Sequence, residues 1–312
     1  MKAQPTSRVG ASRQSRWHKF LWIVPVTIVV LAIVVVAARG VRGLPATQAF
    51  LTDFPGASPL PAAAPVGFPA WLAWQHGLNA FFILFIIRSG WLVRITTRPK
   101  AYWTRDNKAL LKTKGQPVKI SMDLWLHLSI DTLWVLNGLL FYVLLFATGQ
   151  WRRLIPTRWD IFPNALSAAI QYASLNWPVD NGWANYNALQ VLSYFLIVFV
   201  AAPLALITGI RMSPGLAPRL APLEKLFPTS LARKVHFPVM VFFVGFVIVH
   251  VTLVFATGAL TNLNRMYAAR NDNSWAGFLI FAASVLVMAA VWFAAKPVVL
   301  RSIAGFTGRV GR

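Results

Sequence analysis

Long apolar runs separated by polar segments dominate the chain. Six of these runs, at roughly 20 residues each, are long enough to cross a hydrocarbon core about 30 Å thick as helices. They lie near residues 20–38, 70–93, 124–148, 188–210, 236–258 and 275–296. The pattern predicts an all-α membrane protein with six transmembrane helices, in direct contact with the lipid bilayer.

Composition agrees with a membrane environment. Of 312 residues, 57% are apolar and 12% are charged, and the mean hydropathy is +0.59, which is too apolar for a soluble fold of this length. The net charge of +22 would suggest nucleic acid in a soluble protein, but here the cations lie between the apolar runs. We therefore expect no nucleic-acid partner and interpret the cations as topology signals.

The distribution of Lys and Arg predicts the orientation. Segments on one side of the six spans carry 22 of these residues and segments on the other side carry 7. The positive-inside rule then places both termini in the cytoplasm of a multi-pass protein of the cell inner membrane. The first span follows the basic residues Arg8, Arg13, Arg16 and Lys19, so it is either an uncleaved signal anchor or a cleaved signal peptide.

The segment 149–187, on the side with few cations, carries Trp151, Trp159, Trp177 and Trp183. Such aromatic residues are typical of the lipid interface. A docking surface for an external partner is the alternative interpretation.

The absence of cysteine narrows the possible chemistry. It excludes disulfides, thiolate zinc sites, cysteine-ligated iron–sulfur clusters and covalently attached c-type haem. Histidine and carboxylate remain as strong metal ligands. Of the five histidines, His18 lies in the basic N-terminal tail and is expected to be solvated.

The other four histidines fall at matching depths in the predicted helices. His236 and His250 are 14 residues apart in one span, which returns to within about 40° of the same helix face and separates them by about 21 Å. With the predicted orientation, His127 is level with His236 near the inner face, and His76 is level with His250 in the outer leaflet. The sequence therefore predicts two level pairs.

Paired neutral imidazoles on facing bundle helices are what a six-coordinate b-type haem needs. We therefore expect two haem b groups, one held by His76 with His250 and the other by His127 with His236. Small residues near these positions, Gly77, Ala80, Gly138 and Gly245, give weak support because glycine is common in membrane helices. A mononuclear zinc or non-haem iron site needs three or four converging ligands, which histidines some 20 Å apart on one helix cannot supply.

Two further charged residues lie at membrane depth. Asp131 is one turn deeper than His127 and about 40° round from it. It is a candidate to take a quinone proton or to orient a haem-ligating imidazole, with a structural hydrogen bond to a neighbouring helix as the alternative. Arg88 lies about 120° round from His76, and snorkelling to the interface is favoured over a contact with a haem propionate.

The same residues carry a family resemblance. The relevant stretches are Trp74-Gln75-His76-Gly77-Leu78-Asn79-Ala80, Leu126-His127 through Leu136-Asn137-Gly138-Leu139, Tyr186-Asn187-Ala188-Leu189-Gln190, Thr208-Gly209-Ile210-Arg211-Met212-Ser213-Pro214, and His236 to His250. Over about residues 68–260 the chain resembles the di-haem transmembrane cytochrome b subunits of formate dehydrogenase, nickel–iron hydrogenase and thiosulfate reductase.

The resemblance implies a four-helix haem-binding bundle core over 68–260, with the same pairing of the four histidines. Residues 1–67 then form a cytoplasmic tail, an extra transmembrane helix and an extracytoplasmic loop, and residues 261–312 form a sixth helix and a basic tail. The implied role is that of a respiratory electron-transfer subunit rather than a catalytic one. It would carry electrons between a quinone and a partner oxidoreductase of the molybdopterin type.

Two other functions stay open from the residues alone. A proton-coupled transporter could use buried His and Asp131 as a relay, although it predicts helices interrupted near the midplane and an inverted repeat, and Pro203 is the main mid-span candidate. A haem-free membrane anchor could use its histidines for packing only, but packing alone gives no reason for two level pairs.

Overall fold

The computed structural model describes residues 11–106, 117–178 and 182–311, with the side chains of 11–20 outside the description. His18 and several of the cations counted above therefore lie outside the described side chains. Within the described residues, six helices are long and apolar enough to span a membrane. They are Leu21–Arg42, Ala70–Ile95, Met122–Ala147, Ala188–Met212, Thr229–Ala256 and Ala276–Ala294. The prediction of an all-α membrane protein with six spans is confirmed.

The chain divides into two compact units. The first comprises residues 1–59, 157–180 and 186–191. It contains α1 (Ala11–Arg42), α2 (Pro45–Asp53) and α5 (Ile161–Ala173). Helix α1 is anchored at its end, where Arg39 Nε donates to the Ser174 carbonyl and Arg42 donates to the Ser174 hydroxyl, each at 3.1 Å.

The start of the fourth span explains one of the sequence stretches quoted above. The Asn187 side chain accepts a hydrogen bond from the Gln190 amide at 2.9 Å, and the Asn187 amide donates to the Gln190 side chain at 3.0 Å. This reciprocal pair is a capping box, which satisfies two backbone donors at a helix N-terminus. The stretch therefore fixes where the span begins.

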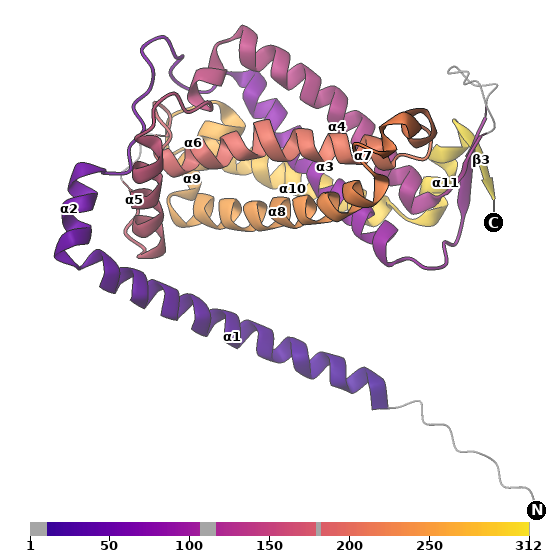
Figure 1. The fold of residues 1–312 in the computed structure, drawn as a ribbon, viewed down its shortest axis with the longest axis horizontal. Coiled ribbons are helices and arrows are strands. Elements are labelled where there is room, and N and C mark those ends of the chain that lie inside the picture. Colours follow the sequence, from indigo (N-terminus) through magenta and orange to yellow (C-terminus); the bar gives the residue numbers. More distant parts are fainter. Residues whose placement is uncertain (1–10, 107–116, 179–181, 312) are drawn as a thin grey trace, which may run out of the picture. The chain divides into compact units, whose positions relative to one another are not determined.

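The second unit comprises residues 60–156, 181–185 and 192–312, and contains the helical bundle. Helix α3 (Ala70–Ile95) packs along α4 (Met122–Ala147), and α7 (Ala202–Met212) packs along α8 (Thr229–Ala256). Helix α10 (Ala276–Ala294) packs against α3 and against η4 (Asn264–Ala268), which follows α9 (Ala259–Leu263). Figure 1 shows α7 running alongside α8. Two short helical segments, η1 (Gln150–Arg153) and η3 (Ala217–Glu224), follow α4 and α7.

The fourth span contains a widened turn that the sequence pattern did not reveal. Helix α6 (Ala188–Phe195) continues through the π-helical segment η2 (Leu196–Ala201) into α7. Pro203 lies at the start of α7, and a proline lacks the backbone N–H and crowds the preceding turn. The Tyr142 hydroxyl on α4 donates to the Val198 carbonyl inside this segment, so the span passes the proline without ending.

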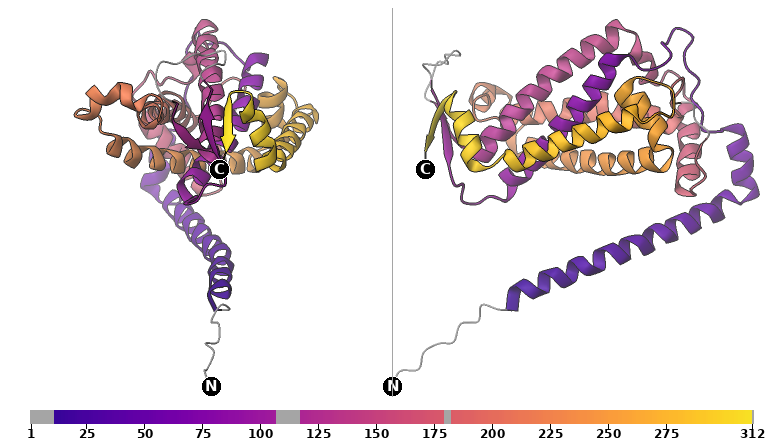
Figure 2. Two further views of the ribbon diagram at one scale, coloured as in Figure 1. Left: turned by 90° about the vertical axis from the view of Figure 1, so that its right-hand side faces the viewer. Right: turned by 180° about the vertical axis from the view of Figure 1, so that it is seen from behind.

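A small antiparallel sheet closes one end of the bundle. Its strand order is β2 (Lys119–Ser121), β1 (Tyr102–Arg105) and β3 (Gly308–Gly311), with Trp103 opposite both Ile120 and Val310. Helix α11 (Pro297–Gly305) packs against β3, and the Trp103 indole donates to the Ala304 carbonyl at 3.1 Å. Figure 2 shows this sheet at the end of the bundle that carries α11. The sequence analysis did not predict this sheet.

Helix α8 begins earlier than its apolar run. The run predicts a span from about 236, whereas the helix starts at Thr229, directly after the extended residue Pro228. Arg233 and Lys234 lie in its first turns and interrupt the hydropathy pattern without interrupting the helix. His236 consequently lies two turns inside α8 rather than at its first residue.

Candidate functional site

The four predicted histidines meet as two facing pairs inside the bundle. The ring centroids of His76 on α3 and His250 on α8 are 6.3 Å apart, with the ring planes at 59°. The centroids of His127 on α4 and His236 on α8 are 6.4 Å apart, with the planes at 88°. The pairing expected from helix depth is the pairing in the structure.

These separations fit one metal ion between the two rings of each pair. A metal–imidazole bond is about 2 Å long, and adding the short distance from each nitrogen to its ring centroid gives about 6 Å between two centroids. Each pair therefore fits axial ligation of a single iron, and no group of three or more histidines or carboxylates that could hold a metal ion occurs among the described residues.

Hydroxyl groups fix the ring orientation in one of the pairs. His127 Nδ1 lies 3.0 Å from Ser89 Oγ on α3, and His236 Nδ1 lies 2.8 Å from Thr208 Oγ1 on α7. The Ser89 hydroxyl donates to the Phe85 carbonyl at 2.7 Å, and the Thr208 hydroxyl donates to the Leu204 carbonyl at 2.7 Å. With the single proton of each hydroxyl assigned to its carbonyl bond, both oxygens accept from the imidazoles.

Glycines give these two rings their space. A Cβ atom on Gly90 would lie 3.1 Å from His127 Cε1, and one on Gly209 would lie 3.7 Å from His236 Cε1. By contrast, a Cβ atom on Gly138 or Gly245 would meet nothing within 4 Å. These two glycines, singled out in the sequence, are therefore not the ones that touch the imidazoles.

Aromatic rings surround the other pair. Tyr267 meets His76 edge-on at 5.3 Å, and Phe246 stacks on His250 at 5.3 Å with the planes 7° apart. Tyr194 meets His250 edge-on at 6.0 Å. His76 Nδ1 is buried and has no hydrogen-bond partner among the described residues. The two pairs thus differ in the chemistry of their surroundings.

Asp131 lies beside the His127–His236 pair. Its Oδ2 is 3.5 Å from His127 Nε2, and its side chain is 31% exposed. Ser89 contacts the other nitrogen of the same ring, and the two roles considered for Asp131 stay predictions. With its proton on Nδ1, His127 has no hydrogen to offer Asp131 from Nε2.

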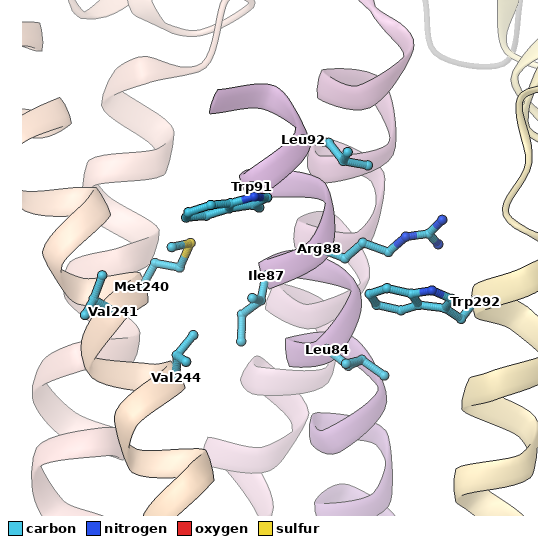
Figure 3. Close-up of a pocket in the computed structure, with 9 residues that line it drawn as sticks. All are labelled: Leu84, Ile87, Arg88, Trp91, Leu92, Met240, Val241, Val244 and Trp292. Carbon is cyan, nitrogen blue, oxygen red and sulfur yellow. The ribbon is translucent and has the colours of Figure 1, made fainter. Parts of the chain in front are cut away.

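An apolar groove of about 640 Å³ opens between α3, α8 and α10. It is lined by Leu84, Ile87, Arg88, Trp91, Leu92, Met240, Val241, Val244 and Trp292. Figure 3 shows Trp91 and Met240 facing each other across the groove, while Arg88 points toward Trp292. The Arg88 guanidinium lies 4.4 Å from the Trp292 ring centroid and donates weakly to the Ala295 carbonyl at the end of α10. Snorkelling of Arg88 to the membrane interface stays a prediction.

Sequence reasoning missed Ser89, Gly90, Tyr267 and Phe246. A signal for two of them was present, because Ser89-Gly90 and Thr208-Gly209 are the same hydroxyl–glycine dipeptide in two apolar spans. Tyr267 had no such signal, because its contact with His76 depends on the path of the chain between α8 and α10.

An all-α bundle of membrane-spanning helices with facing histidine pairs is the architecture of a membrane cytochrome b. The family model for prokaryotic cytochrome b561 matches residues 67–269, and the chain belongs to this family. No curated protein and no solved structure matches the chain. The predicted cytochrome b resemblance is confirmed, and membership implies a multi-pass membrane protein that binds haem b and transfers electrons.

Proposed function

We propose that this chain carries electrons across the membrane through two bis-histidine b haems, one at His76–His250 and the other at His127–His236. The observation that supports this most strongly is the spacing of the rings, 6.3 and 6.4 Å between centroids, because one iron between two imidazoles requires about 6 Å. The haem supplies the one-electron chemistry, and the protein supplies axial ligands, burial and orientation.

The arrangement on α8 supports transfer along the membrane normal. His236 and His250 lie on one face of a single helix, about 21 Å apart along its axis. Each is met by a histidine from the α3–α4 side of the bundle. Two carriers stacked in this way connect one membrane face to the other, with both termini cytoplasmic in the inner membrane.

A quinone is the proposed membrane-soluble electron partner. The apolar groove has a volume within the range of small-molecule sites. On α3 the groove residues flank Ser89 in sequence, which contacts His127, and on α8 Met240 to Val244 lie one to two turns beyond His236. Asp131, near the same pair, is the proposed acceptor of a quinol proton.

The proposed partner at the other end is a soluble oxidoreductase subunit of the molybdopterin type. This proposal rests on the resemblance of the four-histidine pattern to the membrane subunits of formate dehydrogenase and thiosulfate reductase. In this arrangement the chain does no bond chemistry on the substrate of its partner.

The test is a reduced-minus-oxidised visible spectrum with haem stoichiometry on the detergent-purified chain. Two b-type haems per chain are expected. His236→Ala should remove one haem and His250→Ala the other, whereas His18→Ala, a histidine outside both pairs, should remove neither. A folded protein without haem would refute the proposal.

A further inference from the structure

The same hydrogen-bonding arrangement, a buried hydroxyl in contact with an imidazole Nδ1 atom, occurs twice around the His127–His236 pair. On α3, Ser89 bonds the Nδ1 atom of His127, and on α7, Thr208 bonds the Nδ1 atom of His236. Ser89 and Thr208 are both fully buried, and a glycine follows each of them against the same imidazole. Two different helices therefore present the same dipeptide chemistry to the two rings of one pair.

The direction of these hydrogen bonds determines the tautomer of both rings. We assign each hydroxyl proton to the 2.7 Å contact with a carbonyl of its own helix, from Ser89 to Phe85 and from Thr208 to Leu204. Each oxygen is then an acceptor, so the imidazole proton lies on Nδ1. Both Nε2 atoms keep a free lone pair, as a metal ligand requires.

The same bonds change the donor strength of the ligands. A histidine whose N–H is held by an acceptor is a more basic ligand. Two more basic ligands stabilise ferric over ferrous iron, which lowers the reduction potential of a haem. The His76–His250 pair lacks this arrangement at His76, whose Nδ1 has no partner among the described residues, and is surrounded by Tyr267 and Phe246 instead.

We propose that Ser89 and Thr208 are positioning residues that fix the tautomer and orientation of His127 and His236 and lower the potential of the haem between them. The inference rests on the proposed function, because it concerns one of the two proposed haems. It adds a difference between them, since hydroxyl acceptors tune one haem and aromatic packing surrounds the other.

The experiment is a redox titration of the detergent-purified haem-loaded chain, followed by visible and low-spin ferric EPR spectra. Ser89→Ala and Thr208→Val remove the hydroxyl acceptors, while Ser89→Thr and Thr208→Ser keep them. Ser129→Ala and Thr252→Val are matched controls, because these hydroxyls bond only carbonyls of their own helices, at 2.8 and 2.7 Å, in the described structure.

The expected result is an upward shift in the midpoint potential of one of two components, with the other unmoved. The component that shifts must be the one that is lost in His236→Ala. The EPR signal of that component should also change, because the low-spin ferric signal depends on the angle between the two imidazole planes. The hydroxyl-keeping variants and the controls should titrate like the wild type. Ser89→Ala and Thr208→Val test His127 and His236 separately. If one variant does not fold, the other still tests the inference.

Three results would overturn the inference: no shift in either acceptor-free variant, an equal shift of both components, or an equal shift in the controls. Each of these leaves the two haems present. A wild-type chain without haem would instead overturn the proposed function, so the two failures are distinguishable.

Discussion

Adding one methyl group at Gly90 should weaken haem binding at the His127–His236 pair, whereas the same change at Gly209 should not. A Cβ atom at Gly90 would lie 3.1 Å from His127 Cε1, but one at Gly209 would lie 3.7 Å from His236 Cε1. Ordinary carbon–carbon contacts are about 3.5–4.0 Å. Gly90→Ala therefore forces the imidazole to move by a few tenths of an ångström, and Gly209→Ala makes a normal contact.

The cost of this movement follows from what holds the ring. His127 is fixed by its 3.0 Å bond to Ser89, so displacement lengthens that bond and tilts the Nε2 lone pair away from the metal position. Overpacking of this kind costs about 1–3 kcal/mol, which corresponds to roughly a 5- to 150-fold weaker hold on one haem. Both substitutions gain about 1 kcal/mol of helix propensity, so this effect cancels in the comparison.

The assay is the rate and extent of haem transfer from the detergent-purified chain to an excess of a haem-scavenging apoprotein. Gly90→Ala should lose one haem per chain faster than the wild type and retain the second. Gly209→Ala should match the wild type. Equal loss in the two variants would refute the packing argument, because that argument rests on the different distances to the two rings.

Three further outcomes are expected. His236→Ala and His250→Ala should each leave one haem, measured by pyridine haemochrome, and loss of both from either variant would contradict two separable sites. Asn264→Ala should lower the stability of the chain to thermal unfolding in detergent by about 1–3 kcal/mol, because the buried Asn264 amide bonds Asp272 and Ser274. Hydrogen bonds from Ser274 lower the pKa of the Asp272 carboxyl below its ordinary value of 3.8, so their contribution to thermal stability is complete at neutral pH and should disappear only as the pH falls below that value.

The helical fold could be predicted because the membrane imposes it. The six apolar runs have to be helices in hydrocarbon, and their lengths follow from its thickness. The boundaries were harder to place where polar residues continue a helix beyond its apolar core, as Arg233 and Lys234 do at the start of α8. Hydropathy reports where lipid begins, whereas backbone hydrogen bonds decide where a helix begins.

The three-stranded sheet could not be predicted for a different reason. Strand β3 at Gly308–Gly311 pairs with β1 at Tyr102–Arg105, far earlier in the chain. Each strand is only three or four residues long, which is too short for periodicity to detect. The pairing depends on where α3 and α10 end and where α4 begins, which is a property of the assembled bundle.

The histidine pairing could be predicted because the position of a residue along a transmembrane helix gives its depth in the membrane. A spacing of 14 residues fixes both the face and the separation of His236 and His250, and alternating helix direction then assigns His127 and His76. The residues that contact the imidazole rings could not be predicted in this way. Ser89 contacts His127 because of the rotation of α3 about its own axis, and that rotation is set by packing.

The different surroundings of the two pairs have a functional consequence. If both haems had identical ligand environments, their potentials would differ only through position in the membrane. Hydroxyl groups of Ser89 and Thr208 contact one pair, while the rings of Phe246 and Tyr267 pack against the other. Hydrogen bonding to the axial ligands and burial of the haem are separate means of setting its potential. Under the proposed function, these two sets of contacts would give different potentials to two haems that have the same kind of axial ligand.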